Sequence, residues 1–176
     1  MSEKLIYLDN NSTTPVDPRV VDTMIPFFYD IPGNAASRSH PFGWQAEEAV
    51  DYAREQVANL INVDSKEIIF TSGATEADNL GLKGAFEMYK RKGNHIITLE
   101  TEHKAVLDSC KKIEKLGGEV TYLKVGRDGI VDLKELEDAI KDTTILVSIM
   151  WANNETGVIF PVEKMAKMAK ERGILF

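Results

Sequence analysis

The strongest constraint on the fold is a regular alternation of short apolar runs with amphipathic helical segments, which begins at about residue 46. Strands separated by helices of about 10 to 15 residues predict right-handed βαβ crossovers and a mostly parallel sheet with helices on both faces. The run TILVSIM at residues 144–150 is almost unbroken in its apolar character, which is typical of a strand buried on both faces. The predicted fold class is therefore α/β.

The period of the apolar residues places the individual elements. Strands are expected at residues 5–8, 68–70, 95–99, 120–123 and 144–150. Helices are expected at about residues 46–60 and 75–89, around Cys110, after an N-cap at Asp132 and after Pro161, with a short helix after Asp17. Gly117 and Gly173 suit the ends of two of these helices.

The first 45 residues are irregular, unlike the rest of the chain. Residues 9–15 are polar and turn-rich, and residues 33–44 combine small and polar side chains with two aromatics. Loops of this length in a compact domain are commonly functional. We therefore expect an N-terminal segment with active-site loops over residues 1–45 and one large domain over residues 46–176.

The chain ends in Ile174, Leu175 and Phe176, which look like the start of another buried strand. Because strands usually run to about five or six residues, we expect the large domain to be truncated within this strand. A frayed tail is the alternative.

The composition excludes several classes of function. The 176 residues are 43% hydrophobic and 28% charged, as in an ordinary globular protein. A net charge of -7 leaves no basic excess to neutralise the phosphates of a nucleic acid or an anionic membrane. The single cysteine excludes an internal disulfide and a CxxC metal site, and suits a reducing compartment. With no signal peptide and no apolar run near ~20 residues, the sequence predicts a cytoplasmic protein with no metal site.

Three polar loops follow predicted strands, at the carboxyl ends where open parallel sheets bind ligands. They are TSGAT at residues 71–75, ETEH at residues 100–103 and ANNETG at residues 152–157. The amides of Ala74, Thr75 and Glu76 would be unpaired donors at a helix N-terminus, aimed at an anion. The first loop lacks the Lys-Ser/Thr pair of a nucleotide P-loop, so phosphate binding and simple capping both stay open.

The other two loops offer an imidazole and two amides. His103 lies between a strand and a helix, where it could exchange protons over the same sheet edge or could be a surface or capping residue. Asn153 and Asn154 could bond a ligand oxygen or cap their own loop.

Three further residues, His95, His40 and Cys110, have side chains that can take part in chemistry. His95 begins a strand, which favours a structural role, and the role of His40 is open. Cys110 falls on the apolar face of its helix, which predicts an unreactive core thiol with a raised pKa.

Five segments together resemble one enzyme family. They are YLDNNSTTPVDPRV, GNAASRSHPFGWQAEEAV, EIIFTSGATEADNLGLKG, HIITLETEHKAVLDSC and TILVSIMWANNETGVIFPV. In this order they closely resemble the cysteine desulfurases of the NifS/IscS type, which are pyridoxal-phosphate enzymes of the class V aminotransferase group with fold type I. The resemblance runs through essentially all 176 residues. It implies that residues 46–176 are an incomplete pyridoxal-phosphate-binding large domain.

The resemblance also implies roles for four residues. Ala74 and Thr75 match the residues that bind the phosphate of the cofactor. His103 matches the histidine that stacks on the pyridine ring and moves protons, and Asn154 matches the asparagine that hydrogen-bonds the phenolic oxygen. The implied reaction takes sulfur from L-cysteine, leaving L-alanine and a persulfide on an enzyme cysteine. The implied partners are a second copy of the protein and the scaffold or carrier proteins of iron–sulfur cluster assembly or tRNA thiolation.

Some family features have no counterpart in these residues. The resemblance places an aspartate at the pyridine nitrogen, a nearby glutamine, the Schiff-base lysine and the persulfide cysteine beyond Phe176, and Cys110 does not match the last of these. We therefore expect the chain alone to be inactive. Trp151 stands where many relatives have histidine, and Ala35 where many have proline, and we expect both to adjust loop packing. A related enzyme such as selenocysteine lyase, or a non-catalytic subunit of a split enzyme, is the alternative.

Overall fold

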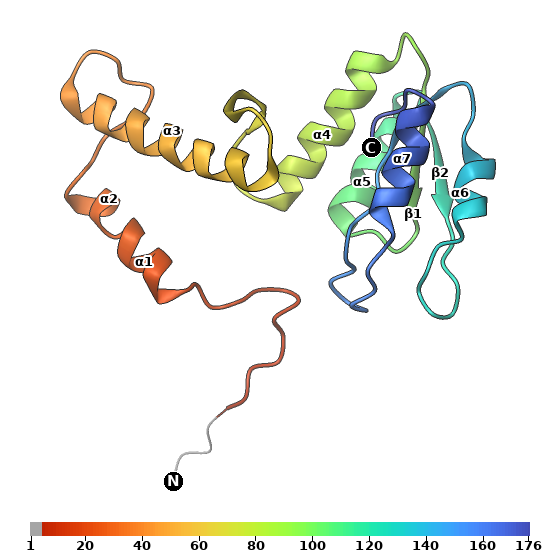
Figure 1. Cartoon of the computed structure of the whole chain (residues 1–176), viewed down its shortest axis with the longest axis horizontal. Coiled ribbons are helices and arrows are strands. Elements are labelled where there is room, and N and C mark those ends of the chain that lie inside the picture. Colours follow the sequence, from red (N-terminus) through yellow and green to blue (C-terminus); the bar gives the residue numbers. More distant parts are fainter. Residues whose placement is uncertain (1–4) are drawn as a thin grey trace. The chain divides into compact units, whose positions relative to one another are not determined.

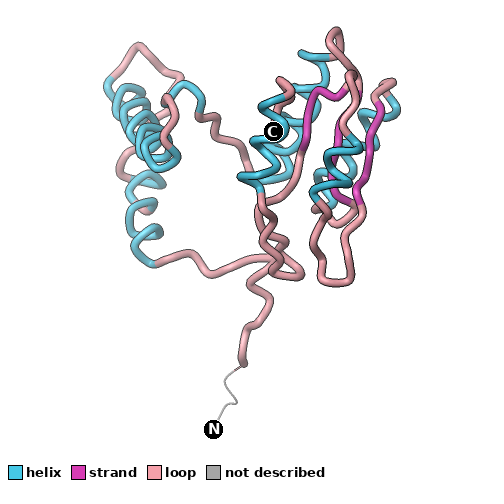
Figure 2. Tube along the Cα trace, turned by 45° about the vertical axis from the view of Figure 1, so that its right-hand side comes forward, coloured by secondary structure: helices cyan, strands magenta, loops and turns pink. Residues whose placement is uncertain are grey.

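The computed structural model describes residues 5–176 and divides the chain into two compact units. The first unit ends at Phe70 and the second spans Thr71–Phe176. Figures 1 and 2 show that the first is helical, whereas the second contains the strands. The predicted division at residue 45 concerns the domains of the whole protein and stays a prediction. Among residues 5–176, no helix has both the length and the apolar character needed to cross a bilayer.

The first unit consists of helices joined by loops. Its elements are α1 (Pro18–Met24), α2 (Pro26–Tyr29), α3 (Pro41–Ile61) and one turn of 3-10 helix, η1 (Ser65–Glu67). α1 begins as predicted, because the Asp17 carboxylate accepts a hydrogen bond from the amide of Arg19 at 2.9 Å and a proline occupies the first turn.

α3 begins earlier than predicted, at Pro41, so the predicted loop over residues 33–44 ends at His40. Nδ1 of His40 accepts a hydrogen bond from the amide of Gly43 at 3.2 Å and caps the helix, which gives this histidine a structural role. A Cβ atom at Gly43 would lie 1.8 Å from the carbonyl oxygen of Ser37, so only glycine fits there.

Two predicted strands, at residues 5–8 and 68–70, are wrong. A strand requires a backbone partner, and neither segment pairs with any other part of the described chain. The side chains of Leu5 and Ile69 are 95% and 70% exposed. Local β propensity without a partner does not make a strand. Residues 1–4, which enter the prediction that no signal peptide is present, lie outside the described residues.

The second unit is built on a parallel sheet, which confirms the predicted α/β class. The central strand is β1 (His95–Leu99), with β2 (Glu119–Leu123) on one side and β3 (Thr144–Val147) on the other. Both pairings are parallel, and their register places His95 opposite Glu119 in β2 and Thr144 in β3. β3 ends at Val147, before the end of the predicted strand at residues 144–150, although the amide of Ser148 still donates to the carbonyl of Ile97 in β1 at 2.9 Å.

The last residues of the chain extend this sheet. Leu175 forms a parallel bridge with Leu146 of β3. Its amide donates to the carbonyl of Ile145 at 3.1 Å, and its carbonyl accepts from the amide of Val147 at 2.8 Å. Residues 174–176 therefore pair like the beginning of a strand, as their apolar sequence predicts.

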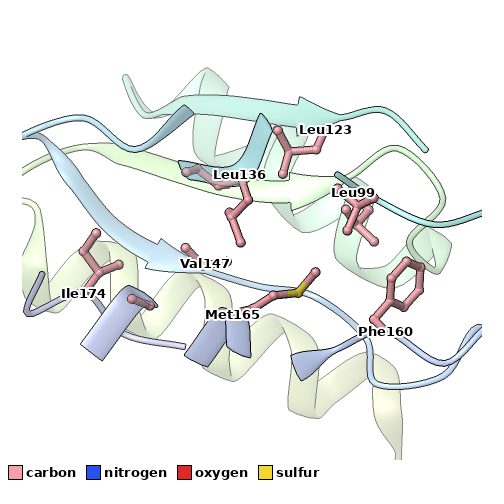
Figure 3. Close-up of a cluster of buried hydrophobic side chains, with 10 residues drawn as sticks. Leu99, Leu123, Leu136, Val147, Phe160, Met165 and Ile174 are labelled. Atoms are coloured by element: carbon pink, nitrogen blue, oxygen red, sulfur yellow. The ribbon is translucent and has the colours of Figure 1, made fainter. Parts of the chain in front are cut away.

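Helices cover both faces of the sheet because side chains alternate along each strand. Ile96 of β1 packs in one apolar cluster with α4 (Ala74–Tyr89) and α5 (Lys104–Lys115). Ile97 and Leu99 pack on the opposite face with α6 (Leu133–Ala139) and α7 (Val162–Glu171). Figure 3 shows the side chains of this second cluster converging between α7 and the strands. All five residues of β1 are buried, so the central strand contacts only protein along its length.

His95 joins the three strands at their amino ends, which confirms its predicted structural role. Its Nδ1 lies 2.7 Å from Oγ1 of Thr144 and its Nε2 lies 2.8 Å from Oγ1 of Thr121. Burial, and then the charge of Lys141, hold the pKa of His95 below its usual value, with Glu119 acting in the opposite direction. The ring is therefore a neutral bridge across the sheet.

Shortening a buried side chain of the cluster in Figure 3 should leave a cavity and lower the free energy of unfolding. Met165 of α7 is fully buried in it, so Met165→Ala should lower the free energy of unfolding by about 2–5 kcal/mol. Urea unfolding followed by circular dichroism measures this loss. Met88 of α4 is 76% exposed, and Met88→Ala should change stability by less than ~0.5 kcal/mol. Equal losses in the two variants would mean that this cluster is not the core.

Candidate active site

The N-terminus of α4 presents backbone amides without acceptors. Gly73 is the N-cap residue, with φ 157° and ψ -179°, a backbone conformation that residues with side chains rarely adopt. The first bond of the helix runs from the amide of Ala77 to the carbonyl of Gly73, at 3.1 Å. Within residues 5–176, the amides of Ala74, Thr75 and Glu76 have no hydrogen-bond partner. These are the donors that the sequence predicts for an anion.

The same turn stabilises one negative charge of its own. The carboxylate of Glu76 accepts a hydrogen bond from the amide of Ser72 at 2.6 Å, and the hydrogen bonds from Ser72 hold the pKa of Glu76 below its usual value. Oγ1 of Thr71 donates to the carbonyl of Gly73 at 3.1 Å and closes the turn. Because the helix dipole also favours negative charge at this end, the turn has the electrostatic character that an anion requires.

His103 follows β1 and is the N-cap residue of α5. Its Nδ1 accepts a hydrogen bond from the amide of Ala105 at 3.2 Å, so the proton of the neutral ring lies on Nε2. The side chain is exposed. His103 therefore serves as a cap through one nitrogen and presents the other, so the two roles considered for it are compatible.

The two asparagines after β3 have different environments. Asn153 is 5% exposed, its Oδ1 accepts from the amides of Glu155 and Thr156 at 2.9 Å each, and its Nδ2 donates to the carbonyl of Thr101 at 3.1 Å. Asn154 is exposed, and its Nδ2 donates to the Glu155 carboxylate over a longer distance of 3.4 Å. Asn153 is thus the loop cap, and Asn154 is the amide that a ligand can reach.

Glu102 is a buried carboxyl group that the sequence does not identify. Its side chain accepts a hydrogen bond from the amide of Met150 at 2.7 Å, so this amide does not pair with a neighbouring strand. Burial raises the pKa of Glu102 to about 6, Met150 acts in the opposite direction, and the charge of Asp78 raises it further. In the sequence Glu102 is one acid in a polar loop, and no pattern marks it as the residue that turns inward.

The three loops lie at the carboxyl end of the sheet. Figure 1 shows the start of α4 and the loops after β1 and β3 at the same end of the second unit. Direct bonds join the loops after β1 and β3, through Glu102 with Met150 and Asn153 with Thr101. α4 lies beside the loop after β3, since Asp78 of α4 lines the same cavity as Ser148 and Ile149.

Cys110 is part of the apolar core beneath the site and is not exposed to it. It is fully buried on α5 in the apolar cluster that contains Val106 and Ile113. Burial raises the pKa of its thiol to about 12, with smaller effects of Glu114 and Glu102 in the same direction. The prediction of an unreactive core thiol is confirmed.

Comparison with known proteins establishes the family. Residues 6–176 match the family described as aminotransferase class-V. The chain belongs to the class-V aminotransferases. This finding confirms the resemblance inferred from the five sequence segments.

Relatives within this family are cysteine desulfurases. This class-V aminotransferase chain is 59% identical, over 173 residues, to the cysteine desulfurase IscS of Escherichia coli O139:H28 and to that of Shigella boydii serotype 18. The matched region is 97% of this chain and 43% of each relative. The chain therefore spans less than half the length of these relatives.

Solved structures give the same result for the fold. A NifS-like protein superposes with a TM-score of 0.90 at 44% identity, over 95% of this chain and 46% of the other. DndA from Streptomyces lividans gives a TM-score of 0.84 at 40% identity, over 97% and 48%. SspA in complex with cysteine gives a TM-score of 0.90 at 35% identity, over 96% and 48%. The predicted fold, an incomplete large domain of this family, is confirmed.

The buried carboxyl group predicts how stability depends on pH. The pKa of Glu102, about 6, lies above its usual value of 4.5, so the folded protein holds this proton more tightly than the unfolded chain. The resulting stabilisation is complete below pH 4.5 and is lost as the pH rises through 6. At ~1.4 kcal/mol per pKa unit the loss is roughly 2 kcal/mol.

Glu102→Gln removes this titration, so relative to wild type its free energy of unfolding should rise by roughly 2 kcal/mol between pH 4.5 and 7. Urea unfolding at several pH values measures the difference, in which the contribution of His95 cancels. Glu100→Gln changes an exposed acid of the same loop and should follow wild type at every pH. A difference between wild type and Glu102→Gln that does not change with pH would contradict the buried, titrating carboxyl group.

Proposed function

We propose that this chain supplies a large part of the cofactor-binding domain of a pyridoxal-phosphate-dependent cysteine desulfurase. The observation that carries the proposal is the grouping of free amides, an imidazole and an amide side chain at one end of the sheet, in a chain 59% identical to IscS relatives. Because the chain covers 43% of those relatives, the activity is proposed for the whole protein to which these residues belong.

The start of α4 is the proposed site for the phosphate of the cofactor. The free amides of Ala74 and Thr75, together with the exposed Thr75 hydroxyl, form a donor set that fits a phosphate dianion. No basic side chain is needed at this turn, because the helix dipole and several amide donors act on the same oxygens.

His103 and Asn154 are the proposed contacts to the ring of the cofactor. The exposed imidazole of His103 can lie against the pyridine ring, and its Nε2 proton can be exchanged with a substrate there. The exposed amide of Asn154 can donate to the phenolic oxygen of the ring. Both side chains leave loops at the same end of the sheet, so one ligand can reach both.

The proposed substrate is L-cysteine, and the products are L-alanine and a persulfide on an enzyme cysteine. When bound, pyridoxal phosphate supplies an electron sink that makes the carbons of an attached amino acid acidic. The related protein SspA has been solved in complex with cysteine, which supports this substrate. Cys110 is not the persulfide residue in this proposal, because its buried thiol has a pKa of about 12.

The proposed setting is the one that the family resemblance implies. We infer a homodimer in the cytoplasm that transfers sulfur to scaffold or carrier proteins for iron–sulfur clusters or tRNA thiolation. The acidic balance of the chain, with a net charge of -7, supports protein partners over nucleic acid.

The test uses the full-length product of the gene. Purified with pyridoxal phosphate, it should release alanine from L-cysteine, and in the presence of a reductant it should release sulfide. Thr75→Ala should weaken cofactor binding by about tenfold or more, because a hydrogen bond to a charged group contributes ~1.5–3 kcal/mol. Titration of the apoenzyme with pyridoxal phosphate measures this.

Thr143→Ala is the matched control, since Thr143 is an exposed threonine beside the amino end of β1. It should bind the cofactor as wild type does. A full-length protein that binds the cofactor but acts on another amino acid and not on L-cysteine would overturn the assignment as a desulfurase. Equal cofactor affinity in Thr75→Ala and wild type would overturn the phosphate site.

A further inference from the structure

The loops after β1 and β3 are joined by two reciprocal hydrogen bonds. Glu102, the residue before His103, reaches across to the β3 loop, where its carboxylate accepts from the amide of Met150 at 2.7 Å. Asn153, the residue before Asn154, reaches the other way, where its Nδ2 donates to the carbonyl of Thr101 at 3.1 Å. Each candidate ring contact is therefore preceded in sequence by a residue that holds the opposite loop.

Both of these side chains are buried, whereas the residues that follow them are exposed. Glu102 is 7% exposed and Asn153 is 5% exposed. Buried hydrogen bonds resist exchange with water, and a buried polar group that loses its partner is costly. Among the described residues 5–176, the side chains of His103 and Asn154 each make one hydrogen bond, at 3.2 Å and 3.4 Å, both to residues within the same loop or helix. The separation between His103 and Asn154 is therefore set by their buried neighbours, Glu102 and Asn153.

Asn153 has a second function that the test must separate from the first. Its Oδ1 accepts two amides of its own loop, those of Glu155 and Thr156, and its backbone carbonyl accepts from the amide of Gly157 at 2.8 Å. The oxygen thus orders the loop after β3, and the nitrogen joins this loop to the one after β1. Replacement by aspartate removes the nitrogen donor and keeps the oxygen, and it places a carboxylate oxygen opposite the Thr101 carbonyl, which breaks the cross-connection.

We propose that Glu102 and Asn153 form a clasp that fixes His103 and Asn154 at the separation required by a ligand ring between them. Glu102 and Asn153 are positioning residues. Each is buried and acts through the exposed residue that follows it in sequence. The inference rests on the proposed function for the identity of the ligand, pyridoxal phosphate. The coupling between the loops is a property of the protein alone and can be measured without cofactor.

The first test is amide hydrogen exchange in the full-length protein without cofactor. Glu102→Ala should speed exchange of the Gly157 amide in the β3 loop by at least about tenfold. Asn153→Asp keeps the oxygen that caps its own loop and removes the donor to Thr101, so it should speed exchange of the Ala105 amide beside His103 by a similar factor. The loosened amide is in each case on the other side of the connection, in the loop after β3 for Glu102→Ala and in the first turn of α5 for Asn153→Asp.

Matched variants separate the clasp from a general loss of structure. Glu102→Gln keeps an oxygen acceptor for Met150 and should restore protection of Gly157 to near the wild-type value. Asn94→Ala removes an amide-to-carbonyl bond of the same length, 3.1 Å, from Asn94 to Gly117 at the other end of the sheet, and should leave Gly157 and Ala105 unchanged. If Glu102→Ala does not fold, Asn153→Asp alone carries the test.

The second test is cofactor affinity in the same variants. In metal sites, removing a residue that orients a direct ligand weakens binding by about ten- to a hundredfold. We expect a comparable loss of pyridoxal phosphate affinity in Glu102→Ala and in Asn153→Asp. In a clasp, the loss of either hydrogen bond frees both loops. The double variant should therefore bind pyridoxal phosphate no more than about threefold more weakly than the weaker-binding single variant. If the fold-losses of affinity in the two single variants instead multiply in the double variant, the two residues act independently and the clasp is wrong.

The two proposals fail in different ways. If exchange on the opposite loop does not change in Glu102→Ala or Asn153→Asp, the clasp is wrong, whatever the enzyme binds. If exchange changes as expected but wild type does not bind pyridoxal phosphate, the loops are coupled and the proposed function is wrong.

Discussion

Burial of β1 on both faces is the constraint on which the second unit depends. All five side chains of this strand are enclosed, with Ile96 on the side of α4 and α5, and Ile97 and Leu99 on the side of α6 and α7. A strand with this character must lie in the middle of a sheet and be covered by helices on both sides. Polar groups can then meet water and ligands only beyond the strand ends, and the candidate site is at the carboxyl end.

Burial shifts the pKa of an ionisable group at each end of this sheet, with a different structural result. Burial favours the neutral form of an ionisable group, so it lowers the pKa of His95 at the amino end and raises that of Glu102 at the carboxyl end. His95 bridges hydroxyl groups of both neighbouring strands and has no exposed surface. Glu102 instead connects two loops whose next residues are exposed. The first arrangement stabilises the sheet, and the second orders the site.

The sequence predicts the helices and strands of the second unit well, because their apolar residues follow the period of the structure they form. It fails at residues 5–8 and 68–70, where apolar β-formers are present but no backbone partner exists in the described residues. Whether a segment pairs with another strand depends on the whole fold and cannot be predicted from its local β propensity. For the same reason the pattern predicts a strand to Met150, whereas the amide of Met150 bonds to Glu102 and β3 ends at Val147.

The candidate site was predictable in its location and in part of its chemistry. Glycine and polar residues after apolar runs indicate the loops, and the free amides at Ala74 and Thr75 follow from helix geometry. The residue pattern alone leaves Asn153 and Asn154 equivalent, since burial decides which of two adjacent amides caps the loop, and the family resemblance is what selects Asn154. It also gives no sign that Glu102 turns inward. Connections across a loop pair require coordinates, because their partners are about 50 residues apart in sequence.

The most direct test of the proposed pyridoxal-phosphate site is a crystal structure of the full-length protein with this cofactor. We predict phosphate oxygens about 2.7–3.1 Å from the amides of Ala74 and Thr75, with the ring between His103 and Asn154. A structure in which the phosphate lies elsewhere, and these amides at the start of α4 still have no acceptor, would contradict the account.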